Sequence, residues 1–77
     1  MPRLPRVTAE EIGRALERVG FAFVRQRGSH RIYRHPESQR RVVVPYHGSR
    51  VVPPGTLANV LRQANLDIER FVELLME

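Results

Sequence analysis

The sequence predicts an α+β fold of two layers, in which two helices cover one face of a three-stranded antiparallel sheet. Three observations indicate this class: a capped amphipathic segment near the N-terminus, three β-forming segments with short connections, and a second amphipathic segment after them. Short connections favour an antiparallel meander, and helices on either side of it in the chain can share one sheet face. We therefore expect an α-β-β-β-α order with a short C-terminal helix, in a single domain, 1–77.

The first predicted helix has clear signals at both ends. Thr8 and Glu11 have the spacing of a capping box, which satisfies free N–H groups at a helix N-terminus. Four apolar residues between Ile12 and Val19 fall on one helical face. Gly20 then ends the helix, because glycine adopts the left-handed conformation without a Cβ clash.

Three strands are predicted at 21–26, 30–35 and 41–45, with a tight turn at Gly28 and a polar loop from Pro36. Pro45 ends the third strand, because proline has no N–H to donate to a sheet. The sequence does not decide which face of the sheet packs against the helices, because two sets of side chains could form that face. One set is Phe21, Phe23, Val42 and Val44, and the other is Ala22, Val24, Val43 and Tyr33.

Two helices are predicted after the sheet. The first begins near Pro54, because proline lacks an N–H and the N–H groups of the first helical turn have no partner within the helix. It ends at Asn65, which tolerates left-handed geometry. Asp67 caps the short terminal helix.

The charge indicates an anionic partner. The formal net charge is +5, and the chain has 13 arginines and no lysine. Arginine presents a planar fork of donors that fits phosphate oxygens, although genome composition or a hot habitat also favours Arg over Lys. Seven of the arginines lie between Arg25 and Arg50, where Glu37 is the one acid. Nucleic acid is thus the first partner to consider. The absence of cysteine excludes thiol chemistry and disulfides.

Histidine is the candidate catalytic residue, because an imidazole exchanges protons near neutral pH. His30 directly follows the Gly28 turn, in a run that also holds Arg27, Arg31 and Arg34. Alternation along a strand places His30, Ile32 and Arg34 on one face and Arg31, Tyr33 and His35 on the other. A metal site is not expected, because carboxylates are scarce near the histidines and the arginines would repel a cation.

An ordered set of motifs runs along nearly the whole chain. It consists of Gly20-Phe21, Arg25-Gln26, Gly28-Ser29-His30, Val44-Pro45-Tyr46-His47, Gly55-Thr56-Leu57 and Arg62-Gln63-Ala64. In this order and spacing the chain resembles the HicA (YcfA-like) toxin family. The resemblance implies a fold like that of double-stranded-RNA-binding domains, an mRNA interferase activity that blocks translation, and a HicB antitoxin as partner. It also implies that His30 is catalytic. Many members carry a second histidine directly after it, where this chain has Arg31.

The resulting hypothesis is RNA cleavage by proton transfer at His30, with no metal or other cofactor. The candidate RNA-binding residues are Arg27, Ser29, Arg31, Arg34 and His47. Ser29 could equally cap the turn, His47 could close a hydrogen bond within its loop, and His35 is expected to be structural. The residue that transfers the second proton is left open.

Two other functions use the same features. A non-catalytic RNA-binding module would employ the same basic sheet face, with His30 as a contact only. A DNA-binding regulator is a weaker alternative, because the second helix offers only Arg62 for base contacts. No apolar run reaches the length of a membrane span, and no secretion signal is visible, so a cytoplasmic location is expected.

Overall fold

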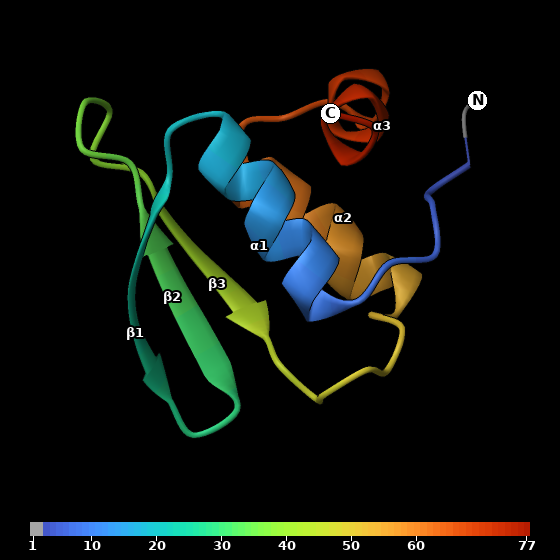
Figure 1. Cartoon of the computed structure of the whole chain (residues 1–77), viewed down its shortest axis with the longest axis horizontal. Helices are drawn as coiled ribbons and strands as arrows, with labels where there is room; N and C mark the ends of the chain where they lie inside the picture. The colour runs from blue at the N-terminus through green and yellow to red at the C-terminus, as the bar shows by residue number, and fades with distance from the viewer. Residues whose placement is uncertain (1–2) are drawn as a thin grey trace.

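The computed structural model describes residues 3–77 and has the predicted α+β class, with helices and strands in the order α1, β1, β2, β3, α2 and α3 (Figure 1). Their bounds are α1 Ala9–Arg18, β1 Ala22–Arg27, β2 His30–Arg34, β3 Arg41–Pro45, α2 Pro54–Ala64 and α3 Ile68–Leu75.

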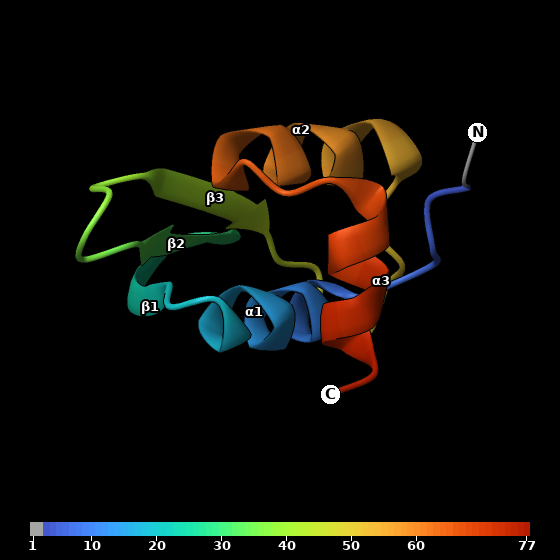
Figure 2. The same ribbon diagram turned by 90° about the horizontal axis from the view of Figure 1, so that it is seen from above.

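The sheet has the strand order β1-β2-β3, and both of its pairings are antiparallel. Figure 2 shows α1 and α2 on the same side of the sheet, where α1 contacts β1 and β3 while α2 contacts β3. The short helix α3 packs on α1. Within residues 3–77 no helix covers the opposite face of the sheet, so this face is available to a ligand.

The core lies between the sheet and the helices. Its largest fully buried side chains come from all three helices and from β3: Ile12, Leu16, Val42, Val44, Leu57, Val60, Phe71 and Leu74. Val42 and Val44 therefore mark the face of the sheet that meets the helices. Their partners across the β2–β3 pairing are Tyr33 and Arg31, which lie on that same face.

The predicted helix ends are confirmed. The Glu11 N–H donates to the Thr8 hydroxyl (3.3 Å), and the Thr8 N–H donates to the Glu11 carboxylate (2.9 Å), which completes the capping box. Asn65 ends α2 in the left-handed conformation, and the Asp67 carboxylate accepts from the Arg70 N–H (2.7 Å) at the start of α3.

The first strand begins one residue later than predicted. The N–H of Phe21 donates to the carbonyl of Leu16 (3.0 Å), and that of Gly20 donates to Glu17 (3.0 Å). This pair of bonds closes the end of α1 around Gly20, whose φ is +98°. Phe21 is thereby taken out of the strand and buried in the core.

A β-bulge interrupts β1 at Val24. Phe23 pairs with Tyr33, whereas the next pair is Arg25 with Ile32, so Val24 is the extra residue. The bulge reverses the alternation of side chains along the strand. Phe23 lies on the helix-facing side, at the edge of the sheet and 48% exposed, while the residues after the bulge change sides.

The outer edge of β3 is partly closed by α2. The N–H of Val43 points away from β2 and donates to the side-chain oxygen of Gln63 (2.9 Å). No helix in the described part of the chain is long and apolar enough to cross a membrane.

Candidate functional site

The uncovered face of the sheet carries three rows of cross-strand partners, which we call the open face. The first row is Arg27, His30 and Pro45; the second is Arg25, Ile32 and Val43; the third is Ala22, Arg34 and Arg41. Cross-strand partners share a face, so His30 lies in the first row opposite Arg27 of β1. The three strands contain no acidic residue. The open face therefore combines one imidazole with four arginines.

The bulge at Val24 accounts for two of these arginines. Phe23 faces the helices, and strict alternation would have turned Arg25 and Arg27 the same way. The extra residue instead sets both arginines opposite Ile32 and His30, on the open face. The sequence did not predict Arg25 or Arg41 as site residues, because neither the bulge nor the strand register has a clear signal in the chain.

The turn that precedes His30 is held from both sides. Gly28 has a φ of +59°, a conformation that favours glycine, and its carbonyl accepts from the Gln26 side chain (3.0 Å). The Ser29 carbonyl accepts from the N–H of Tyr46 (2.5 Å), which follows β3. The expected role of the Ser29 hydroxyl in capping the turn is not seen, since it has no hydrogen-bond partner within residues 3–77.

His30 itself is exposed, and its ring has no hydrogen-bond partner among residues 3–77. Its backbone is fixed by the turn before it and by pairing with Arg27 on one side and Pro45 on the other. Its position is thus defined by the sheet, and both ring nitrogens remain available to a ligand.

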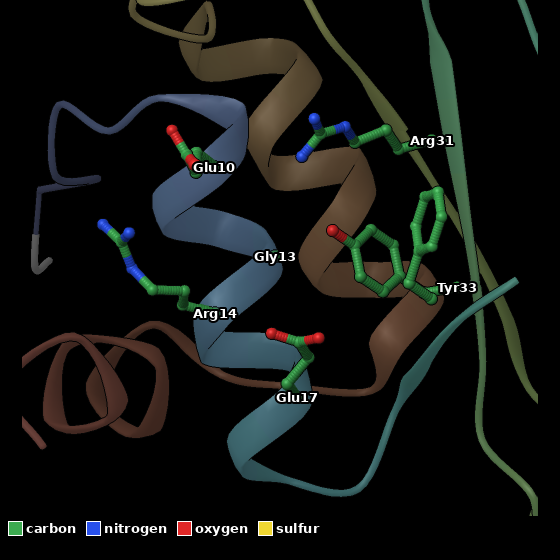
Figure 3. A pocket seen from close by; sticks show the side chains of 7 residues that line it. Glu10, Gly13, Arg14, Glu17, Arg31 and Tyr33 are labelled. Atoms are coloured by element: carbon green, nitrogen blue, oxygen red, sulfur yellow. The ribbon is translucent and has the colours of Figure 1, made fainter. Parts of the chain in front are cut away.

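Arg31 lies on the opposite side of the sheet from His30. Its guanidinium sits over the ring of Tyr46, 3.8 Å from the centroid, and its Nε–H donates to Gln26 (3.2 Å). Figure 3 shows Arg31 and Tyr33 reaching from β2 toward α1, where they line a pocket with Glu10, Gly13, Arg14, Glu17 and Phe23. Arg31 therefore cannot act beside His30 on one phosphate.

Tyr33 lines the same pocket, but its hydroxyl is not suited to act as a general base. Burial raises the pKa of its hydroxyl above the usual value of 10.0, against the opposing effect of the nearby Arg31 guanidinium. The hydroxyl therefore keeps its proton at neutral pH. It also lies directly against Gly13, where an added Cβ would come within 2.2 Å of the oxygen.

Arg34 shares the open face with His30 but lies at the other end of β2. They are four residue steps apart along the strand, which corresponds to roughly 13 Å. The Arg34 guanidinium donates to the Gln39 side chain in the β2–β3 loop. The Arg34 and His30 side chains are therefore too far apart to contact one phosphate group.

His35 has a structural role, as expected. Its Nε2 is 3.1 Å from the carbonyl of Val19, and its Nδ1 accepts from the N–H groups of Glu37 (3.2 Å) and Ser38 (3.3 Å). The ring also packs edge-on against Phe21, with 5.1 Å between centroids. It connects the end of α1 to the β2–β3 loop.

His47 is exposed in the loop between β3 and α2. The expectation that its ring closes a hydrogen bond within the loop is wrong for the described residues, since only its backbone carbonyl accepts, from the Arg50 N–H (3.3 Å). His47 is instead one of the residues that line a small pocket at the end of β3. Among residues 3–77, no three His, Asp or Glu side chains gather as a metal site would require.

Comparison with known families supports the resemblance drawn from the sequence. The family model described as "HicA toxin of bacterial toxin-antitoxin" matches residues 9–66, which is 58 of the 77 residues. The matched span contains α1, the whole sheet and α2, and with them the open face and His30. A search of curated proteins found no match.

Proposed function

Because the chain belongs to the HicA toxin family and is the toxin of a bacterial toxin–antitoxin system, we propose that it is an endoribonuclease that cleaves mRNA at His30. The observation that carries this proposal is the first row of the open face, where the exposed His30 is the direct cross-strand partner of Arg27. RNA cleavage needs both groups: one to move a proton and one to stabilise charge on phosphorus.

The chemistry follows from this pair. The ribose 2′-oxygen attacks the adjacent phosphorus, the bond from phosphorus to the 5′-oxygen breaks, and a 2′,3′-cyclic phosphate and a 5′-hydroxyl result. His30 acts as general base toward the 2′-hydroxyl or as general acid toward the departing 5′-oxygen. Arg27 donates to the non-bridging oxygens as their charge grows. Arg25, Arg34 and Arg41 contact flanking phosphates along the open face.

Two substitutions at His30 test the proposal with purified protein and a single-stranded RNA. His30→Ala removes the proton-transfer group, and His30→Arg keeps a cation there that does not release a proton near neutral pH. We expect both variants to lose cleavage by about 100-fold or more, while His30→Arg still binds RNA. Wild-type protein that binds RNA without cleaving it would instead identify a non-catalytic RNA-binding module.

A modified RNA separates the two possible roles of His30. Sulfur in place of the bridging 5′-oxygen leaves without needing a proton. If His30 is the general acid, His30→Ala should cleave this RNA at nearly the wild-type rate. If it is the general base, the variant should stay slow on both substrates.

The paired antitoxin is proposed to be a HicB-type protein that covers the open face in the cytoplasm. The same arginines that bind phosphate would then meet acidic side chains of the antitoxin. Co-expression with a HicB-type antitoxin should give a complex that does not cleave RNA. A complex that leaves cleavage unchanged would contradict this mode of inhibition.

A further inference from the structure

A small pocket adjoins the open face at the end of β3. Its volume is about 260 Å³, and it is formed by the loop after β3 and the first turn of α2. Pro45, Val51 and Pro53 form apolar walls, while His47, Arg50 and Thr56 supply the polar groups. None of these residues takes part in the cleavage chemistry proposed for His30 and Arg27.

Pro45 connects this pocket to His30. It is the direct cross-strand partner of His30 in the first row, and it also lines the pocket. A strand of RNA whose phosphate meets His30 therefore has its neighbouring nucleotide within reach of the pocket.

The loop around the pocket is held in place by backbone hydrogen bonds. The Val52 N–H donates to the Val7 carbonyl (2.8 Å), and Thr8 forms a bridge with Val51, which attach the loop to the start of α1. Tyr46 binds the turn before His30, and the Arg50 N–H closes onto His47 (3.3 Å). The pocket is thus shaped before any ligand arrives.

The lining fits one particular chemical class. A nucleobase has flat apolar faces and polar edges, and proteins stack unpaired bases on imidazole and guanidinium planes. The His47 ring, the Arg50 guanidinium and the Thr56 hydroxyl have no hydrogen-bond partner within residues 3–77, so they can serve a ligand. The volume lies just below the roughly 300–1,000 Å³ of pockets for drug-sized molecules, which suits a single base.

We propose that this pocket binds one unpaired nucleobase next to the phosphate that is cleaved. The proposal rests on the proposed function and refines it, because the arginines of the open face contact only backbone phosphates, whereas the pocket contacts a base. The substrate is then single-stranded RNA, since a base within a duplex cannot enter. The pocket also gives the enzyme a means of choosing among bases.

Nucleotide binding to the ¹⁵N-labelled His30→Ala protein tests the pocket directly. The four 3′-mononucleotides are titrated to millimolar concentration, and ribose 5-phosphate serves as the control ligand without a base. We expect at least one nucleotide to shift the amide signals of Val51, Val52 and Thr56, while ribose 5-phosphate leaves them in place. Equal shifts with ribose 5-phosphate, or none with any nucleotide, would overturn the proposal.

A matched pair of variants tests its role in cleavage. Val51→Phe fills the pocket, and Val72→Phe makes the same change at an exposed position on α3 outside it. We expect Val51→Phe to slow cleavage of single-stranded RNA by about tenfold or more, and Val72→Phe to cleave at the wild-type rate. Equal rates for both variants and wild type would contradict a base in the pocket.

Two further measurements separate the possible failures. If Val51→Phe proves unstable in thermal unfolding, His47→Ala replaces it, because this variant removes a ring from the pocket without adding bulk. We expect His47→Ala to slow cleavage to a similar extent. If the wild-type protein cleaves no RNA at all, the proposed function fails, whereas the nucleotide shifts in His30→Ala still decide the pocket. Shifts caused by the antitoxin and not by any nucleotide would assign the pocket to protein binding.

Discussion

At the scale of single residues, the three histidines occupy three different environments. His30 is exposed on a fixed backbone, His47 lines a pocket in a loop, and His35 makes three polar contacts and one aromatic contact. A side chain that makes several contacts contributes to stability, whereas one with none can change without loss. The contrast between His35 and His30 can be measured.

We expect His35→Ala to lower the free energy of unfolding by about 1–3 kcal/mol, because the Val19 carbonyl and two loop N–H groups lose their partner. His30→Ala should change it by no more than about 0.5 kcal/mol. Urea denaturation of both variants measures the difference. A comparable loss for His30→Ala would show that its effect on cleavage includes unfolding.

Gly13 offers a second test at this scale, because the Tyr33 hydroxyl fills the space that a side chain would need. Gly13→Ala should destabilise the protein by about 1–3 kcal/mol through overpacking, and adding Tyr33→Phe should recover part of that loss. The matched control is Gly55→Ala on α2, where an added Cβ meets nothing within 4 Å. Thermal unfolding should show this control to be neutral or stabilising.

At the scale of elements, two devices shape the sheet. The bulge in β1 turns Arg25 and Arg27 to the open face, and Gln63 on α2 closes part of the outer edge of β3. An exposed strand edge invites pairing with other chains. The Gln63 contact thus ties α2 to the sheet and protects the strand that carries Pro45.

Gln63→Ala should cost about 1–2 kcal/mol, because the Val43 N–H loses its acceptor. Gln63→Glu keeps an acceptor oxygen and should retain most of the stability. Hydrogen exchange at the Val43 amide, together with urea denaturation, measures both effects. Asn59→Ala on α2 is the control, since the Asn59 side chain accepts a hydrogen bond from Arg62 (2.7 Å) and has no other hydrogen-bond partner within residues 3–77. Slow exchange at Val43 in Gln63→Ala would contradict the assigned role.

At the scale of the whole molecule, charge is separated between the two layers. The three strands hold arginines and no acid, whereas seven of the eight acidic residues lie on α1 or between Asp67 and the C-terminus. The molecule therefore presents a basic sheet and a more acidic helical side. Such an arrangement orients an incoming polyanion toward the open face.

The salt dependence of RNA binding tests this arrangement. In the His30→Ala background, which is expected to leave RNA intact, Arg25→Ala and Arg27→Ala should each reduce the slope of log K against log salt concentration by about 0.7. Arg14→Ala, on α1, should leave the slope unchanged. Fluorescence anisotropy with a labelled single-stranded RNA measures all three. Equal slopes for Arg14→Ala and Arg27→Ala would show that RNA does not bind through the open face.

The sequence by itself determined the elements and the choice of His30. Helix caps at Thr8 and Asp67, the stop at Gly20, the turn at Gly28 and the third strand up to Pro45 depend on residues only a few positions apart. Local contacts of this kind are readable from the chain. The family motifs lie on the same elements, and the family match confirmed the resemblance.

Only the tertiary structure decided which residues accompany His30. The bulge at Val24 brought Arg25 and Arg27 to its face, and the strand register added Arg41. Arg31, its neighbour in the chain, went to the other side of the sheet, over Tyr46. These outcomes depend on pairing between strands and on packing of helices against one face, which join residues distant in the sequence. The pocket beside Pro45 has the same origin, because β3, the following loop and α2 each supply part of its wall.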